Sequence, residues 1–242
     1  MMTNWDTQVT VGELVRERPA RSRVFEALRI DYCCGGKLSL AEACARRSLD
    51  ATDVLAQIRA DDAATTQRGA AESDVAALGL AELADHIEQT HHVYLRGALP
   101  RLAQLIDRVH KVHGAAEPRL AQVRAAFAGF EQEVSQHMLK EERILFPMIR
   151  ALELTGAQAV GDFHCGSIAH PIRQMEYEHD QAGDALATLR TATDGFAPPE
   201  WACNTYRAML AGLAELEADM HQHIHKENNI LFPRALELEQ AA

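Results

Sequence analysis

Apolar residues recur at helical spacing along most of the chain beyond its first third. In one stretch they fall at Leu95, Leu99, Leu102 and Ile106, which places them on one face of an α-helix. Gly and Pro residues interrupt the pattern, as expected between helices. The pattern predicts four long helices, over residues 77–113, 117–154, 167–193 and 199–238. Four amphipathic helices of this length favour an all-α fold built around a four-helix bundle.

The N-terminal segment predicts a separate, smaller helical domain. Two stretches carry a hydroxyl residue followed three positions later by Glu, the signature of a capped helix start: Thr10 with Glu13, and Ser39 with Glu42. The segment DYCCGG at 31–36 forms a loop between two of these helices. From Asp61 to about Asp74 no apolar periodicity remains, which is typical of a linker. We therefore expect a helical N-terminal domain at 1–60, a linker at 61–76 and the bundle at 77–242.

Composition excludes several classes of protein. Hydrophobic residues make up 47% of the chain and aromatic residues only 5%, a mixture that favours close helix packing over a sheet core. The net charge of −11 would repel phosphate backbones, so we expect no nucleic-acid partner. No run approaches the ~18 apolar residues that cross a bilayer, and the first residues do not resemble a secretory signal. We expect no membrane partner and a cytoplasmic location, with the five cysteines reduced.

An internal repeat is the most informative feature of the bundle sequence. His137–Pro147 reads HMLKEERILFP and His223–Pro233 reads HIHKENNILFP, so seven of eleven positions agree at an offset of 86. Each copy has His and Glu four residues apart, which projects both from one helix face and suits two ligands of one metal site. A single such pair would be explained more simply as a surface pair. Two copies inside a repeat favour metal binding.

A helix upstream of each copy carries a candidate third ligand. His179 lies 44 residues before His223, and His92 lies 45 residues before His137. His86 and His91 are alternatives to His92. Steps of three, seven and ten residues from His92 reach three leucines, whereas the same steps from His91 reach a poorer core face. We therefore assign His92, and expect His86 and His91 to be solvated or to lie behind the ligands.

Four imidazoles and two carboxylates are too many ligands for one tetrahedral zinc ion. They suit two metal ions bridged by Glu141 and Glu227. Mixed nitrogen and oxygen ligation with open positions fits two iron ions, with manganese as an alternative. The predicted metal ligands are His92, His137, Glu141, His179, His223 and Glu227.

Three further acids are candidates for supporting roles. Glu133 and Asp219 each lie four residues before a predicted ligand histidine, and Glu178 directly precedes His179. These carboxylates could orient the ligands or relay protons. Ordinary exposed acids are the alternative interpretation.

The adjacent cysteines Cys33 and Cys34 cannot easily form a relaxed disulfide with each other. An exposed, Gly-flanked thiol pair suggests redox, nitrosyl or metal-transfer chemistry. Two inert, half-buried thiols in a turn are the alternative.

Four segments together resemble the di-iron iron-sulfur cluster repair family, the Repair of Iron Centres or ScdA/YtfE type: DYCCGGK at 31–37, EHD at 178–180 and the two repeat copies. The resemblance covers nearly the whole chain. It implies a cysteine-bearing N-terminal domain followed by a hemerythrin-like bundle, with the same six residues as ligands of a non-haem di-iron site. It also implies a role in restoring iron-sulfur clusters damaged by nitric oxide or peroxide. The loop from Thr155 to His170 is longer than is usual in that family.

The leading hypothesis is a cytoplasmic stress-response protein whose di-iron centre reacts with nitric oxide and donates iron to damaged clusters. The resemblance supplies that role, and the residue spacing supplies only the metal site. Its partners would be damaged iron-sulfur proteins, with nitric oxide or oxygen as small ligands, and a homodimer is compatible with the sequence. Nitric oxide reductase activity is the enzymatic form of this hypothesis. The alternatives are a hemerythrin-like protein that binds or senses oxygen or nitric oxide without turnover, and a structural bundle with adventitious metal.

Overall fold

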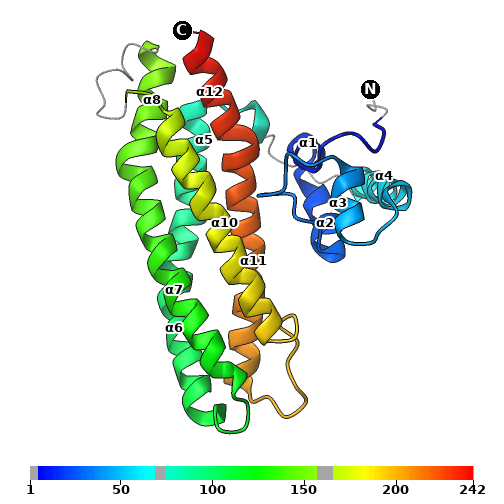
Figure 1. Ribbon diagram of the computed structural model, residues 1–242, viewed down its shortest axis with the longest axis vertical. Coiled ribbons are helices and arrows are strands. Elements are labelled where there is room, and N and C mark those ends of the chain that lie inside the picture. Colours follow the sequence, from blue (N-terminus) through cyan, green and yellow to red (C-terminus); the bar gives the residue numbers. More distant parts are fainter. Residues whose placement is uncertain (1–4, 69–74, 157–165, 242) are drawn as a thin grey trace. The chain divides into compact units, whose positions relative to one another are not determined.

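The computed structural model describes residues 5–68, 75–156 and 166–241. Within these ranges every named element is helical, and the β-type pairing is limited to an isolated bridge between Thr10 and Ser39 (Figure 1). The expected all-α class is confirmed. Most of the long loop expected at 155–170 lies outside the described residues.

Four helices and a 3₁₀ turn make up the N-terminal region: α1 (Val11–Glu17), η1 (Pro19–Arg21), α2 (Ser22–Leu28), α3 (Leu40–Arg46) and α4 (Ala51–Arg68). Both predicted capping boxes are present, because the Thr10 and Ser39 side chains each accept a hydrogen bond from the backbone of the Glu three residues later. Apolar side chains such as Leu14, Phe25 and Ile58 are wholly buried and form the core of this region.

The linker was predicted to begin at residue 61, and this start is wrong. Helix α4 continues to Arg68, and Asp62 forms a buried ion pair with Arg21 at 2.7 Å. The segment lacks apolar periodicity, but Ala, Gln and Arg favour helix, and the paired carboxylate ties this turn to the N-terminal core. Residues 69–74 of the expected linker lie outside the described residues, and Val75–Ala77 form the 3₁₀ turn η2.

Four long helical rods follow. Their elements are α5 (Leu80–Ile87), η3 (Glu88–His92) and α6 (Val93–His113); α7 (Arg119–Lys140), η4 (Glu141–Leu145) and α8 (Phe146–Thr155); α10 (Ala169–Ala192); and α11 (Asn204–Lys226), η5 (Glu227–Leu231) and α12 (Phe232–Ala241). Figure 1 shows the rods side by side. The four predicted helices are confirmed to within a few residues at most ends. Wholly or almost wholly buried residues such as Leu95, Leu102 and Leu189 provide the apolar face that periodicity predicted.

Three of the rods contain a π-helical turn. At η3, η4 and η5 the next residue's N–H donates to a carbonyl five positions earlier instead of four. The prolines Pro147 and Pro233 follow η4 and η5 at the second position of α8 and α12, where a missing N–H is more easily tolerated. A π turn shifts the helix register by one residue and is frequent at functional sites.

The chain divides into two compact units. The first comprises Met1–Gly79 together with His221–Arg234, and the second comprises Leu80–Met220 together with Ala235–Ala242. In the first unit α1 packs against η5, so a segment expected to belong only to the bundle also contributes to the packing of the N-terminal helices. Among the described helices, none is both long enough and apolar enough to cross a membrane.

Candidate metal centre

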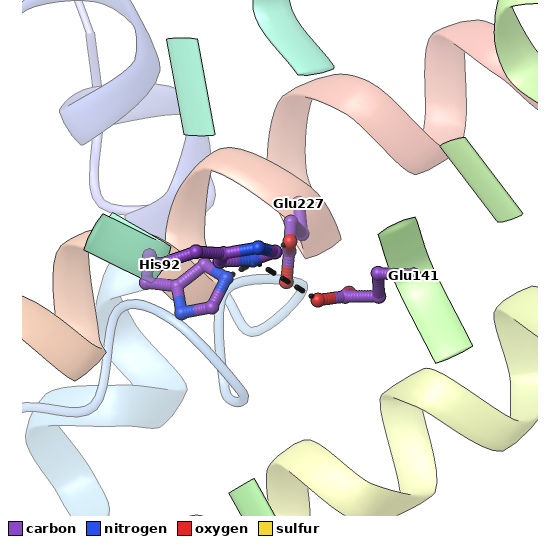
Figure 2. Close-up of side chains that lie close together, drawn as sticks. His92, Glu141 and Glu227 are labelled. Atoms are coloured by element: carbon purple, nitrogen blue, oxygen red, sulfur yellow. Dashed lines mark hydrogen bonds and ion pairs between the residues drawn. The ribbon is translucent and has the colours of Figure 1, made fainter. Parts of the chain in front are cut away.

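Six predicted ligand residues form two overlapping groups of buried side chains. One group is His92, Glu141, His223 and Glu227, and the other is His137, Glu141, His179 and Glu227. In each group the ligand atoms lie within 4.8 Å of one another. Figure 2 shows the Glu141 and Glu227 carboxylates beside His92. The two groups share both carboxylates, which is the arrangement expected for two cations bridged by two glutamates.

The distances inside the groups define the donor set. Glu141 lies between two imidazoles, 3.2 Å from His137 Nε2 and 3.3 Å from His92 Nε2. In the repeat copy His223 Nε2 lies 3.0 Å from Glu227. His179 Nε2 lies 3.1 Å from His137 Nε2. Each of these four histidines therefore directs Nε2 into the cluster.

The π turns place the shared glutamates. Glu141 and Glu227 are the first residues of η4 and η5, and His137 and His223 lie one helical turn before them. His92 is the last residue of η3, so three of the six side chains belong to π turns. Glu141, Glu227, His92 and His223 have no exposed surface. Burying two carboxylates is costly unless cations or hydrogen bonds compensate them.

Carboxylates behind two of the histidines fix the direction of their rings. His92 Nδ1 lies 2.7 Å from Glu142, and His137 Nδ1 lies 3.0 Å from Glu178. A proton on Nδ1 that is donated to a carboxylate leaves the Nε2 lone pair available to a metal. Glu178 also accepts hydrogen bonds from Lys140 and Gln174. The hydrogen bond from His137 is the main cause that lowers the pKa of Glu178 to about 2.

Sequence reasoning named Glu178 but missed Glu142. Glu142 accepts hydrogen bonds from His92 and from Arg96, one turn further along the same rod. The pairing joins two different rods, so no spacing within one helix reveals it. The only local signal is Arg96 at four residues after His92, a cation on the same face that favours an acidic partner.

The other two predicted supporting acids lie elsewhere. Asp219 is 2.8 Å from His91 Nδ1, so it contacts the chain neighbour of a predicted ligand. Glu133 is exposed and lines a cavity that His137 and His179 also line. This cavity is a path by which a small molecule could reach two of the six side chains. The supporting roles of Glu133 and Asp219 remain predictions.

The cysteine loop differs from the expected exposed thiol pair. Cys33 is buried, with 4% of its surface exposed, and Cys34 is half-buried. The Asp31 carboxylate accepts hydrogen bonds from the Cys33 and Cys34 backbone and from the Cys33 thiol. The contact with Cys34, followed by burial, raises the pKa of the Cys33 thiol well above its usual value. Asp31, Cys33 and Cys34 bring ligand atoms within 4.8 Å of one another.

Comparison with known proteins finds a match for each end of the chain. Residues 83–235 match the hemerythrin HHE cation-binding domain, and residues 7–62 match a domain of unknown function called ScdA_N. A protein of Musicola paradisiaca (strain Ech703) is 40% identical over 230 residues, which cover 94% of this chain and 96% of that protein. Proteins of Citrobacter koseri and Escherichia coli O81 are each 40% identical over 227 residues, covering 93% of this chain and 96% of each relative. All three relatives are named "Iron-sulfur cluster repair protein YtfE". The chain therefore belongs to the hemerythrin HHE cation-binding family, in the group that carries an ScdA_N domain and includes the YtfE iron-sulfur cluster repair proteins.

Proposed function

We propose that the six buried side chains hold a non-haem di-iron centre. His92 and His223 would bind one ion, and His137 and His179 the other, with Glu141 and Glu227 shared between them. The observation that carries this assignment is the pair of overlapping quartets with both carboxylates in common. Four neutral imidazoles and two carboxylates have a total charge of −2. Two divalent cations bound to them leave a net positive charge, which favours the binding of an anionic ligand and permits a neutral one. Family membership supports iron as the metal.

The protein's own residues prepare this site by orienting ligands. Glu142 and Glu178 hold His92 and His137 with Nε2 toward the centre, so each ring is ready to bind metal without reorientation. The apolar residues Val134, Ala182 and Met220 contribute to the cavity beside His137 and His179. Charged and polar residues, among them Glu133 and Lys140, complete the lining. When bound, the iron pair supplies redox chemistry and open coordination positions.

We propose that this centre serves the repair of iron-sulfur clusters damaged by nitrosative or oxidative stress, with nitric oxide as a small ligand. The names of relatives that align along 96% of their length support the repair role. The cavity that His137 and His179 line supports access for a small molecule. The cysteine loop supports a role beyond simple binding, because a carrier of oxygen or nitric oxide needs no thiols. We further propose a cytoplasmic location, damaged iron-sulfur proteins as partners, and a helical N-terminal domain that includes α4, followed by the bundle at 77–242.

A repair assay tests this function directly. An iron-sulfur enzyme whose cluster has been damaged with nitric oxide is incubated anaerobically with the iron-loaded protein, and recovery of its cluster spectrum is followed. Recovery with the native chain and none with Glu141→Ala supports the proposal, with His86→Ala as a control outside the six residues. Nitrous oxide is monitored in the same vessel after addition of nitric oxide. Stable nitrosyl binding without cluster recovery would contradict repair and indicate a sensor.

A further inference from the structure

The two repeat copies differ at four positions, and two of these lie on one helical face. At an offset of 86, His225 takes the place of Leu139, and Asn229 takes the place of Arg143. In each copy the two positions are four residues apart, so they lie on the same side of the helix. Neither position belongs to the six predicted ligands.

This face is exposed in the first copy and covered in the second. Leu139 and Arg143 are exposed, and Ile144 has 45% of its surface exposed. In the second copy His225 is buried, and Ile230, the counterpart of Ile144, is only 3% exposed.

Residues of the cysteine loop provide the cover. Asn229 Nδ2 donates to the carbonyl of Cys33 at 3.0 Å, with the carbonyl of Tyr32 at 3.4 Å. The His225 ring packs edge-on against the Tyr32 ring, with centroids 5.6 Å apart. Gln222 lies about one turn before His225, and its side chain donates a hydrogen bond to the Tyr32 hydroxyl at 3.0 Å. All these residues belong to the first compact unit.

Two glycines make room for the Asn229 side chain. A Cβ at Gly12 would lie 2.6 Å from Asn229 Oδ1, and a Cβ at Gly36 would overlap the same oxygen more severely. The two glycines are joined by a hydrogen bond from the Gly12 N–H to the Gly36 carbonyl at 2.9 Å. Asn229 thus inserts into a pocket that only residues without a side chain can form.

We propose that Asn229 is a positioning residue that holds the Cys33–Cys34 loop against the π turn that begins with Glu227. We call the contact of Asn229 with this loop the latch. The latch keeps Cys33 buried, and its release exposes that thiol to solvent. Because Asn229 and Glu227 belong to the same π turn, a change of that turn on metal binding alters the strength of the latch. By linkage, opening of the loop alters metal affinity in return. The coupling to metal rests on the function proposed above, whereas the latch itself does not.

Thiol accessibility in the metal-free full chain tests the latch. Each cysteine is alkylated with iodoacetamide, and modification of Cys33 and Cys34 is timed by mass spectrometry of their fragment ions. Loss of the buried hydrogen bond in Asn229→Ala is expected to raise the Cys33 rate roughly tenfold. Arg143→Ala, the matched position in the first copy, is expected to leave it unchanged. An unchanged Cys33 rate in a folded Asn229→Ala would overturn the latch.

Two more variants guard against misfolding and against a merely structural role. Asn229→Asp keeps the shape but loses the donor, so its Cys33 rate should match that of Asn229→Ala; the wild-type rate would exclude the hydrogen bond as the cause. Gly36→Ala should give the same increase by closing the pocket. Circular dichroism confirms the fold of each variant.

Iron loading then tests the coupling. In the native chain it is expected to change the Cys33 rate, and in Asn229→Ala this response should vanish at equal iron content. Equal responses in both proteins would overturn the coupling. A chain that binds no iron would overturn the proposed function, and leave the metal-free latch result standing by itself.

Discussion

The two repeat copies share their buried His and Glu but differ in how much of their outer face is covered. In both, a His and a Glu one turn apart are buried, and the Glu begins a π turn that ends before a Phe-Pro pair. On the outside, Arg143 and Ile144 of the first copy are exposed, whereas in the second copy Asn229 contacts the cysteine loop and Ile230 is buried. The shared His and Glu belong to the metal site, and the change from Arg143 to Asn229 accompanies the contact with the cysteine loop.

The largest expected effect follows from the shared inner face. Replacing either Glu141 or Glu227 with Ala should destroy the dinuclear centre, because one remaining carboxylate cannot bridge and neutralise two cations. Iron content should fall from about two per chain to one or fewer, with loss of magnetic coupling between the irons. His86→Ala should retain both. A coupled pair in Glu141→Ala with Glu227 intact would show that the copies are not equivalent.

Removing the iron should destabilise the bundle, since metal that binds only the folded chain adds to its stability. A ligand at a thousand times its dissociation constant adds about 4 kcal/mol, which corresponds to a Tm change of roughly 10 °C in a chain of this size. Metal binding requires neutral imidazoles, so protons compete with the metal as the pH falls. The added stability should therefore be present at neutral pH and disappear on acidification. Equal melting curves for loaded and metal-free protein at pH 7 would place the metal at the surface.

The outer faces should respond very differently to the same truncation. Ile230→Ala removes a buried side chain and should lower the free energy of unfolding by ~2–4 kcal/mol. Ile144→Ala removes a half-exposed side chain, and its effect should stay near ~0.5 kcal/mol. Denaturant unfolding of the two metal-free variants measures both values. Similar losses in the two proteins would mean that the second copy is not covered in solution.

Ring orientation by the outer carboxylates should have a smaller effect. Glu142→Gln and Glu178→Gln keep a hydrogen-bond acceptor but remove the charge behind His92 and His137. Each should weaken iron affinity by about 10–100-fold, as is usual for groups that orient metal-binding histidines. A competition titration with a coloured chelator gives the affinity. Asp184→Asn, at an exposed acid of α10, serves as the control and should bind iron as the native chain does.

The cysteines should have no effect on iron content. Cys33→Ala with Cys34→Ala leaves all six proposed ligands in place, so loading should match the native chain, while cluster repair should be impaired. Of the two thiols in the native chain, Cys33 should react more slowly with iodoacetamide at pH 8. Its burial and raised pKa leave little thiolate at that pH. Loss of iron in the double variant would contradict this prediction and indicate that the cysteines are iron ligands.

The sequence predicted the helices and the six clustered residues because both depend on spacing within one helix. Periodicity places His92 on the buried side, and the repeat relates Glu141 to Glu227. Features that depend on two elements could not be predicted from spacing within one helix. The Glu142 contact depends on how one rod is rotated relative to another, and the Asn229 pocket depends on the path of a loop. Helix α4 was missed beyond residue 60 because a helix held by the Arg21–Asp62 pair needs no apolar stripe. The π turns were not predicted either, since a single shift of register leaves little trace in an eleven-residue repeat.

The central claim is that the chain holds two irons that share Glu141 and Glu227. Anaerobically reconstituted protein should be freed of loose metal, assayed for iron per chain and examined by Mössbauer spectroscopy in an applied magnetic field. We expect close to two irons per chain, of high-spin type with nitrogen and oxygen ligands, whose spins are coupled through the shared carboxylates. One iron per chain, or two irons with independent spins, would contradict it.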